Sequence, residues 1–565
     1  MRASLARHAS LLSEPVAVAL LAIGAAGCGL RLWMAFHLAP HIDEPASVLA
    51  AEMTARHGFP ILPSGVPYLQ GATLSYLLCP LFWLGWGSPD HLHLLRLLSV
   101  ALGVATVVVA YLLGRDAADD RGVGILSAAF VALDPVSLQW SGHVRMYAPL
   151  ELLSVALVWR FTLALRAPSN PALPWGIVAI FWLATYTHIV VAFLLPALAL
   201  STVASALRDG WRARAKLFAA LGVCGLAPVS LLALNRLLQP DPDAVANGGM
   251  LRAFVGGHLL TFQRFVHPSF RSWKLTFVPG TGSRLAPTVI VGCTAVMLLA
   301  AIPAVRGNRP PPGIIVVLVA YWTPVLLTAA IVTQAQPRYL ISVQPLGLVL
   351  TAMVVRRLWP GVGSGVPRGM APAARGAAAA FALAVALHLG DGARSLLIKS
   401  IGDADYPAAA RFVALHRKTG EPVLSAMTPA LHLALDGDGD LRFLPGPAGR
   451  ERAKRYTRRV GGGYVDYWLG VPAIVTTAGL CTFIEENPDA WIVVDRLRLG
   501  APWGMKGQME TVIRGMTVEV YRAGGATSVL RIPAKRFWTE QAVAVCGHRF
   551  GKVDVSDQPQ TAGAR

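Results

Sequence analysis

Charged residues are scarce in this sequence. Only 14% of its 565 residues are Asp, Glu, Lys or Arg, whereas a soluble globular domain has about 25%. Hydrophobic residues make up 54% of the chain, and the mean hydropathy is +0.52. This composition excludes an ordinary soluble protein. It favours a protein of the membrane, because many of the apolar runs are long enough to cross a bilayer.

Several motifs of soluble enzymes are absent. The sequence has no Walker phosphate-binding loop, no Gly-x-Ser-x-Gly nucleophile elbow and no His-Glu-x-x-His zinc pair. Its six cysteines include no Cys-x-x-Cys spacing, which argues against a structural zinc site. Cys481 and Cys546 lie in a polar C-terminal region, and the sequence leaves open whether they form a disulfide, which an oxidising compartment would allow.

Acidic residues are the rarer of the two charged classes. The chain has 31 Asp and Glu against 50 Lys and Arg, which gives a formal net charge of +19. In a membrane protein this excess is typical of Arg-rich cytoplasmic loops and of contact with anionic membrane lipids. No basic helix accompanies a known nucleic-acid reader motif, so we expect no nucleic-acid partner.

The apolar runs predict about eleven membrane crossings. They lie at about 14–36, 93–114, 122–141, 147–166, 173–189, 190–207, 217–238, 286–306, 313–333, 338–357 and 373–390. A further stretch, 71–86, contains Pro80 and Gly85 and is either a span or an interfacial helix. Basic loops alternate along this series, so the positive-inside tendency places the N-terminus in the cytoplasm and the region 37–92 outside. We therefore predict a multi-pass protein of the inner (plasma) membrane.

The region after about residue 395 differs in character from the rest of the chain. It is polar, with β-like runs at 491–494 and 517–521 and a helical pattern at 406–416. The predicted fold class is mainly α, a polytopic membrane protein with 11–12 transmembrane helices and a C-terminal α/β domain. The predicted boundaries are a membrane domain over 1–392 and an extracytoplasmic domain over 393–565.

One acidic pair, Asp43 and Glu44, follows the first apolar run. Carboxylates at this boundary must be solvated or functional, because burying a charge in hydrocarbon is costly. A partly desolvated Asp43 suits a general base that removes a proton from an acceptor hydroxyl, with Glu44 orienting it or binding a metal. The structural alternative makes Asp43 the N-cap of an amphipathic helix over 45–57, with Pro45 at its first position.

Basic and aromatic residues are predicted to meet this pair at the same external face. An arginine at the mouth of a span can hold a phosphate with two hydrogen bonds, or it can simply extend to the membrane interface. The histidine of the group is equally compatible with ligand binding and with an interfacial packing role. The candidates for contact with a donor phosphate or sugar are Arg145, Tyr147, His188, Arg264, Arg338 and Tyr339.

The order of these motifs resembles the GT-C superfamily of membrane glycosyltransferases. The most similar branch is the glycosyltransferase family 39-like one, which contains the protein O-mannosyltransferases and the aminoarabinose transferases of lipid A. The resemblance covers about 14–390. It rests on the acidic pair with its amphipathic helix, on Leu-Leu-Arg-Leu-Leu-Ser at 94–99, on Gly-His-Val-Arg-Met-Tyr at 142–147, and on Pro-Arg-Tyr-Leu at 337–340 followed by Pro345.

The resemblance implies an inverting transfer of a sugar from a polyprenyl phosphate to an acceptor hydroxyl of a protein, lipid or glycan on the extracytoplasmic side. Asp43 matches the base of the family, and Arg145 and Arg338 lie where phosphate contacts are expected. No cofactor is required, although some members of the superfamily use a divalent cation. The sequence departs from the aminoarabinose type at 68–72, where a Lys-Pro step is missing, so the resemblance does not identify the sugar.

Two other functions compete with this one. A transporter or flippase for a lipid-linked envelope precursor would place its charges at the bilayer midplane between symmetric halves. A non-catalytic scaffold for envelope assembly would tolerate loss of Asp43. The position of Asp43 relative to the membrane distinguishes the enzyme from the transporter.

Overall fold

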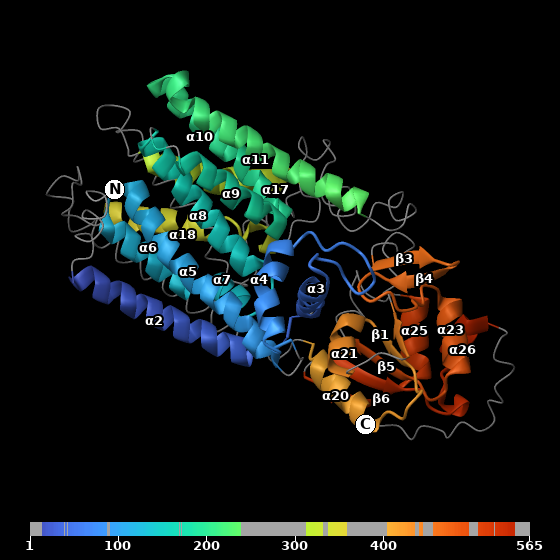
Figure 1. The fold of residues 1–565 in the computed structure, drawn as a ribbon. Coiled ribbons are helices and arrows are strands. Elements are labelled where there is room, and N and C mark those ends of the chain that lie inside the picture. Colours follow the sequence, from blue (N-terminus) through green and yellow to red (C-terminus); the bar gives the residue numbers. More distant parts are fainter. Residues whose placement is uncertain are drawn as a thin grey trace.

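The structure is a computed structural model, and it describes residues 14–547 with gaps. The gaps are 39, 42, 88–90, 169, 171, 239–311, 332–336, 359–403, 436–439, 445–455, 496–506 and 525. The predicted spans at 286–306 and 373–390, the predicted domain boundary and Arg264 therefore lie outside the described residues. Within the described part, a helical bundle is joined to a smaller α/β unit (Figure 1).

The bundle consists of long apolar helices that run roughly side by side (Figure 1). Five helices of the described chain are long and apolar enough to cross a membrane, or six if one bent pair counts as a single span. The chain is a multi-pass membrane protein. The helices are α2 (Glu14–His37), α5 (Leu92–Ala118), α6 (Arg121–Leu133), α7 (Pro135–Ser141), α8 (Tyr147–Arg166), α9 (Ala172–Thr187), α10 (Leu194–Asp209), α11 (Trp211–Leu237), α17 (Pro312–Ile331) and α18 (Gln344–Leu358).

Helix α5 is central to the bundle and packs against α2, α6 and α8. Its contact with α6 is close because Gly114 has no side chain: a Cβ there would overlap the hydroxyl of Ser127 on α6. Small residues at such contacts allow two membrane helices to approach each other closely.

The predicted span over 122–141 is bent in the structure. The structure divides it into α6 and α7, which meet at an angle of 58° around Asp134. Pro135 has no N–H to continue the hydrogen bonding of α6, and it disfavours a helical backbone at the preceding residue. Asp134 accordingly has ψ 121, and its carboxylate accepts the N–H of Ser137 at 2.8 Å, which begins α7.

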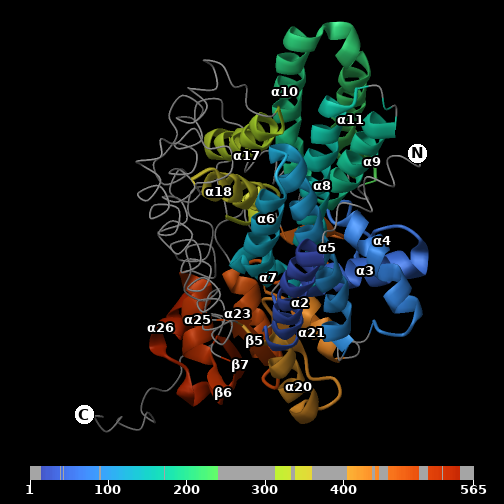
Figure 2. The ribbon, with the colours of Figure 1, turned by 90° about the vertical axis from the view of Figure 1, so that its left-hand side faces the viewer.

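The segment between α2 and α5 carries two shorter helices, α3 (Glu44–His57) and α4 (Ala72–Trp83), which pack against each other. Figure 2 shows them beside the end of the bundle, at the level where the α/β unit begins. With 12 residues, α4 is about 18 Å long, too short to cross a bilayer by itself. Of the two alternatives for 71–86, the structure favours the interfacial helix.

The C-terminal unit contains a mixed five-stranded sheet with the strand order β2-β1-β5-β7-β6. Strand β1 pairs in parallel with β2 and β5, and the other pairings are antiparallel. A separate antiparallel hairpin, β3–β4, completes the unit. The strands are β1 (Val423–Ser425), β2 (Leu441–Phe443), β3 (Thr457–Val460), β4 (Gly463–Asp466), β5 (Trp491–Asp495), β6 (Val518–Ala523) and β7 (Thr527–Arg531).

Helices cover both faces of this sheet. Along β5, Ile492 and Val494 pack on one face against α23 (Thr477–Glu486) and α25 (Gln508–Met516), together with α26 (Glu540–Cys546). Val493 packs on the other face against α20 (Tyr406–His416) and α21 (Thr428–Leu435). Because side chains alternate along a strand, a fully apolar strand belongs between two helical layers. The predicted α/β region is confirmed.

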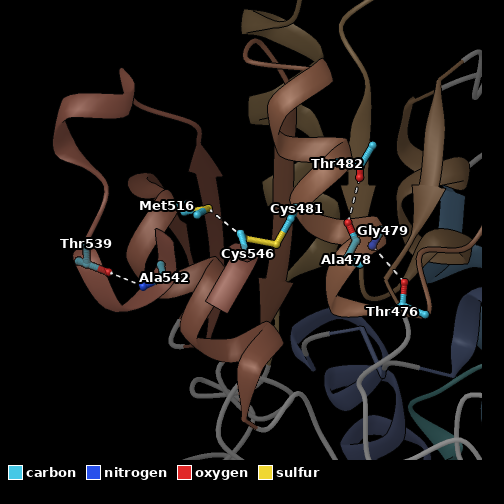
Figure 3. Close-up of a disulfide and its surroundings, with 9 residues drawn as sticks. All are labelled: Thr476, Ala478, Gly479, Cys481, Thr482, Met516, Thr539, Ala542 and Cys546. Carbon is cyan, nitrogen blue, oxygen red and sulfur yellow. Dashed lines mark hydrogen bonds between the residues drawn. A yellow bond between two sulfur atoms is a disulfide. The ribbon is translucent and has the colours of Figure 1, made fainter. Parts of the chain in front are cut away.

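A disulfide between Cys481 of α23 and Cys546 of α26 ties two helices of this unit together (Figure 3). It closes a loop between residues 65 positions apart. The sequence left this pairing open, and the structure contains it.

Replacement of both cysteines by alanine should lower the stability of the α/β unit. A loop of this length predicts a loss of roughly 2–4 kcal/mol in the free energy of unfolding. Denaturant unfolding of the purified full chain, without added oxidant or reductant, measures this loss. Wild-type protein whose disulfide has been reduced should unfold like the variant. The matched control is Cys224→Ala, which removes a buried free cysteine from α11. Equal stability of the double variant and the wild type would contradict the prediction.

The α/β unit is attached to the segment that carries α3. Phe443 and Trp468 pack against Ala46 and Ala50 of that helix. Beside them, the hydroxyl of Ser64 donates to the carbonyl oxygen of Tyr467 at 2.6 Å. The backbone N–H of Ser64 donates to the carbonyl oxygen of Trp468 at 3.1 Å. Ala46 is less than one helical turn from Asp43, so the unit packs directly beside the predicted site.

Candidate active site

Asp43 lies immediately before α3, at the point where the chain turns into the helix. The predicted helix over 45–57 is confirmed, with Pro45 in its first turn. Asp43 occupies the predicted N-cap position, but its side chain makes no capping hydrogen bond. Instead, its carboxylate lies 3.6 Å from the guanidinium of Arg145 and 3.9 Å from Nδ1 of His41. The side chain is 33% exposed, so this carboxylate can reach a ligand.

Arg145 holds the start of α3 from the loop between α7 and α8. Its Nη1 donates to the backbone oxygen of Asp43 and to the hydroxyl of Ser47, both at 2.8 Å. The guanidinium also lies 5.8 Å from the ring centre of Tyr147. Its side chain is only 6% exposed, which places a nearly desolvated positive charge beside a partly exposed carboxylate. Such a charge attracts anions strongly because little water screens it.

Glu44 has a different environment from its neighbour, because it is completely buried. Arg96 of α5 binds it with two hydrogen bonds, Nε to Oε1 at 2.9 Å and Nη2 to Oε2 at 2.7 Å. The Nδ1–H of His143 donates to Oε2 at 3.1 Å, and the N–H groups of Val144 and His41 donate at 2.7 and 2.6 Å. These contacts join α5, the loop 142–146 and the start of α3 at one carboxylate.

The pKa of Glu44 follows from this arrangement. Burial alone would raise the pKa, but the Arg96 guanidinium and His143 hold it well below its usual range. The group is therefore an anion whose hydrogen-bonding capacity is occupied by protein. Of the roles predicted for Glu44, this geometry favours orienting Asp43 over binding a metal or contacting a substrate.

His41 is a neutral neighbour of Asp43. Burial lowers the pKa of His41 to about 4, so the ring carries no charge at neutral pH. Its Nδ1 accepts the backbone N–H of Asp43 at 3.2 Å, which places the ring proton on Nε2. The ring packs edge-on against Trp140 with centroids 5.2 Å apart. His41 thus orients the backbone of Asp43 without adding positive charge.

A row of rings connects this cluster to other predicted residues. Trp140 lies 4.3 Å from Tyr147, Tyr147 lies 6.1 Å from His188, and His188 lies 6.3 Å from Tyr339, measured between ring centroids. His188 also accepts the N–H of Val190 at 3.2 Å and so begins the short helix η2 (Ile189–Phe193). The structure thereby brings Tyr147, His188 and Tyr339 to the same end of the bundle as Asp43.

The side chains of two predicted site residues, Arg338 and Arg264, lie outside the described part of the structure. The backbone of Arg338 lies next to Tyr339 in the short helix η3 (Pro337–Leu340), but its side chain falls outside the described part, as does the whole of Arg264. Among the described residues, no group of three or more His, Cys, Asp or Glu side chains could hold a metal ion. Sequence analysis assigned no functional role to Arg96 or His143, although both stand in the motifs that carried the resemblance.

The amino-acid sequence of this chain matches no known relative. No family model matches the chain, and no curated protein is similar to it.

Solved structures are similar over most of the chain. ArnT from Cupriavidus metallidurans, bound to undecaprenyl phosphate, has a TM-score of 0.53 at 15% identity and covers 93% of this chain and 99% of its own. The oligosaccharyltransferase AglB from Archaeoglobus fulgidus, in complex with an inhibitory peptide and a dolichol-phosphate, has a TM-score of 0.54 at 14% identity and covers 94% and 77%. Both are GT-C membrane glycosyltransferases. This chain has the GT-C fold, as the resemblance predicted.

Proposed function

We propose that this protein is an integral-membrane glycosyltransferase that moves a sugar from a polyprenyl phosphate to an acceptor hydroxyl. The observation that carries the proposal is the pairing of a partly exposed carboxylate, Asp43, with the buried guanidinium of Arg145 at 3.6 Å. The GT-C fold supports it. A base next to an anion-binding group is what a sugar transfer with a phosphate leaving group requires.

The proposed reaction is an inverting displacement. Asp43 takes the proton of the acceptor hydroxyl, and the hydroxyl oxygen forms a bond to the anomeric carbon. The bond between that carbon and the phosphate oxygen breaks on the opposite face, and its electron pair leaves with the polyprenyl phosphate. The departing phosphate gains negative charge, which Arg145 stabilises in a site with little water.

The remaining predicted residues are assigned to the donor. Tyr147, His188 and Tyr339 lie along the row of rings that begins beside Arg145 and would contact the sugar or phosphate. Arg338 and Arg264 are proposed as further phosphate ligands. The acceptor is a hydroxyl of a protein, lipid or glycan. The proposal does not depend on a cofactor and leaves a divalent cation open.

The orientation in the membrane is part of the proposal. The Cys481–Cys546 disulfide supports an α/β unit in an oxidising compartment, outside the plasma membrane. This orientation leaves the N-terminus in the cytoplasm and Asp43 on the outer side. Asp43 lies in the segment between two spanning helices, beside the α/β unit rather than within a span. That position favours an enzyme over a transporter or flippase.

Substitution of Arg145 tests the phosphate site directly. Arg145→Ala should weaken the affinity for undecaprenyl phosphate by about 10- to 100-fold, because a charge-assisted hydrogen bond in a desolvated site contributes roughly 1.5–3 kcal/mol. Titration of the purified protein with undecaprenyl phosphate measures this change. The control is Arg56→Ala, which removes an exposed arginine of α3 that pairs with Glu52 of the same helix. Unchanged affinity in Arg145→Ala would remove the phosphate role.

A further inference from the structure

Arg31 is a buried arginine inside the first spanning helix, α2, and the proposed reaction gives it no task. Its side chain is completely buried, and within the described part of the chain its guanidinium donates to carbonyl and hydroxyl oxygens and to no carboxylate. All five of its N–H groups have acceptors on the protein. The acceptors are the carbonyl oxygens of Val131 and Ala132 at 3.0 Å and of Gly27 at 3.2 Å, and the hydroxyls of Ser141 at 3.2 Å and Ser137 at 3.4 Å.

The two carbonyls at 3.0 Å belong to the broken end of α6. In a continuous helix, Val131 would accept the N–H of residue 135, but that residue is proline and has none. The end of a helix also leaves its last carbonyls without partners, and in a membrane an unpaired carbonyl is costly. Arg31 supplies the missing donors, and its positive charge suits the negative end of the α6 dipole.

The same guanidinium holds the other side of the break. Ser137 and Ser141 lie at the middle and the end of α7, so Arg31 contacts both α6 and α7 across their 58° bend. The neighbouring helix α5 has Gly103 at this place. A Cβ on that glycine would overlap the hydroxyl of Ser141 and lie 2.7 Å from Nε of Arg31. The space for this contact therefore depends on the absence of a side chain on α5.

The hydrogen bonds of Arg31 continue to α8 through one hydroxyl. The hydroxyl of Ser137 donates to Oε2 of Glu151 on α8 at 2.6 Å. A buried charge of this kind persists only where it is paired or fully hydrogen-bonded. The bend is thus held by a connected polar network that joins α2, α6, α7 and α8.

Along the chain, this polar network directly precedes the residues of the proposed phosphate site. Helix α7 ends at Ser141, and only Gly142 separates it from His143, which bonds to Glu44. Two residues later, Arg145 bonds to Asp43 and Ser47. A change in the direction of α7 would move the loop 142–146, and with it the guanidinium that faces Asp43.

We propose that Arg31 is a positioning residue of the phosphate site. It holds the bend between α6 and α7 at the angle that delivers Arg145 to the leaving phosphate, and it does not touch the substrate. This inference rests on the proposed function, because it assigns Arg145 to the phosphate.

The test compares undecaprenyl phosphate affinity in four proteins: wild type, Arg31→Met, Arg145→Ala and the double variant. Arg31→Met should weaken binding about tenfold or more, because displacement of a binding group by about 1 Å costs up to roughly a hundredfold. Because Arg31 acts through Arg145, the double variant should bind no more weakly than Arg145→Ala alone. A general loss of structure would lower affinity in both backgrounds, so this comparison separates positioning from stability.

Two further variants complete the design. Arg31→Lys keeps the charge but offers three donors without the planar fork, so it should fold and bind with an affinity between those of wild type and Arg31→Met. This variant carries the test if Arg31→Met fails to fold. The control is Arg214→Met, another buried arginine, which bonds to Ala164 at the other end of α8 from Tyr147. It should bind like the wild type.

The outcomes distinguish the inference from the proposed function. Wild-type affinity in Arg31→Met or Arg31→Lys would overturn the positioning role. The role would also be overturned if Arg31→Met weakened binding by the same factor in the Arg145→Ala background as in the wild type. Wild-type affinity in Arg145→Ala itself would instead overturn the phosphate assignment on which the inference rests.

Discussion

Asp43→Asn should abolish sugar transfer while leaving the protein folded and able to bind undecaprenyl phosphate. An asparagine amide cannot take the proton of the acceptor hydroxyl, and loss of a general base typically costs about 10²–10⁴ in rate. The substitution keeps the backbone oxygen that accepts from Arg145. It also removes a negative charge beside the phosphate site, so affinity should be retained or increased.

The rate is measurable without knowing the sugar. Solubilised membranes from a strain without this protein supply the lipid-linked donors and the protein, lipid and glycan acceptors, and mass spectrometry follows the release of free polyprenyl phosphate by the purified protein. The matched control is Glu52→Gln, which replaces another carboxylate of the same segment with its amide at a site paired only to the exposed Arg56. Wild-type turnover in Asp43→Asn would defeat the assignment of the base.

Arg96→Met should destabilise the protein more than any surface substitution. It leaves the carboxylate of Glu44 fully buried without its bidentate partner, and breaking such a pair costs roughly 3–5 kcal/mol. The double variant Glu44→Gln with Arg96→Met should be more stable than Arg96→Met alone, because it removes the uncompensated charge. Denaturant unfolding in detergent gives the free energies of all three proteins.

The chain offers a control pair for this cycle on the same helix. Glu52 and Arg56 form a partly exposed pair four residues apart on α3, and breaking such a pair costs about 0.5 kcal/mol or less. If Arg96→Met proves as mild as Arg56→Met, Glu44 does not anchor α3 as the structure indicates. If the double variant is the least stable of the three, uncompensated charge is not the reason for the loss.

The bundle was largely predictable because hydropathy reports bilayer crossings directly. The apolar runs at 93–114 and 147–166 correspond closely to α5 and α8. The break at Asp134 was missed because the run 122–141 is mostly apolar and contains no other charged residue. Pro135 signals a bend, but hydropathy alone does not register one.

The site was predictable in part. The motif order placed Asp43 and Arg145 at one face of the membrane, and the structure brings them to 3.6 Å. Their supporting residues were not predictable. Arg96 and Arg31 lie in apolar runs. An arginine in such a run is equally compatible with a supporting role in a site and with an interfacial position. Their partners, Glu44 and Val131, are 52 and 100 residues away along the chain, so no local pattern connects them.

The adjacency of Asp43 and Glu44 also concealed a difference in environment. The sequence presents two neighbouring carboxylates as a pair with related roles. The start of α3 turns Glu44 inward to α5 and the loop 142–146 and leaves Asp43 partly exposed. The difference arises from tertiary packing of α3 against α5 and the loop 142–146, which the local sequence does not encode.

The most direct test of the central claim uses the cell envelope itself. Mass spectrometry would compare lipid-linked sugars and envelope glycans from a strain without this protein and from the same strain expressing either the wild type or Asp43→Asn. We predict that one polyprenyl-phosphate sugar accumulates, and one sugar decoration disappears, in the deletion strain and in the Asp43→Asn strain alike. Unchanged lipid-linked sugars in the deletion strain, or full restoration of the decoration by Asp43→Asn, would contradict the account.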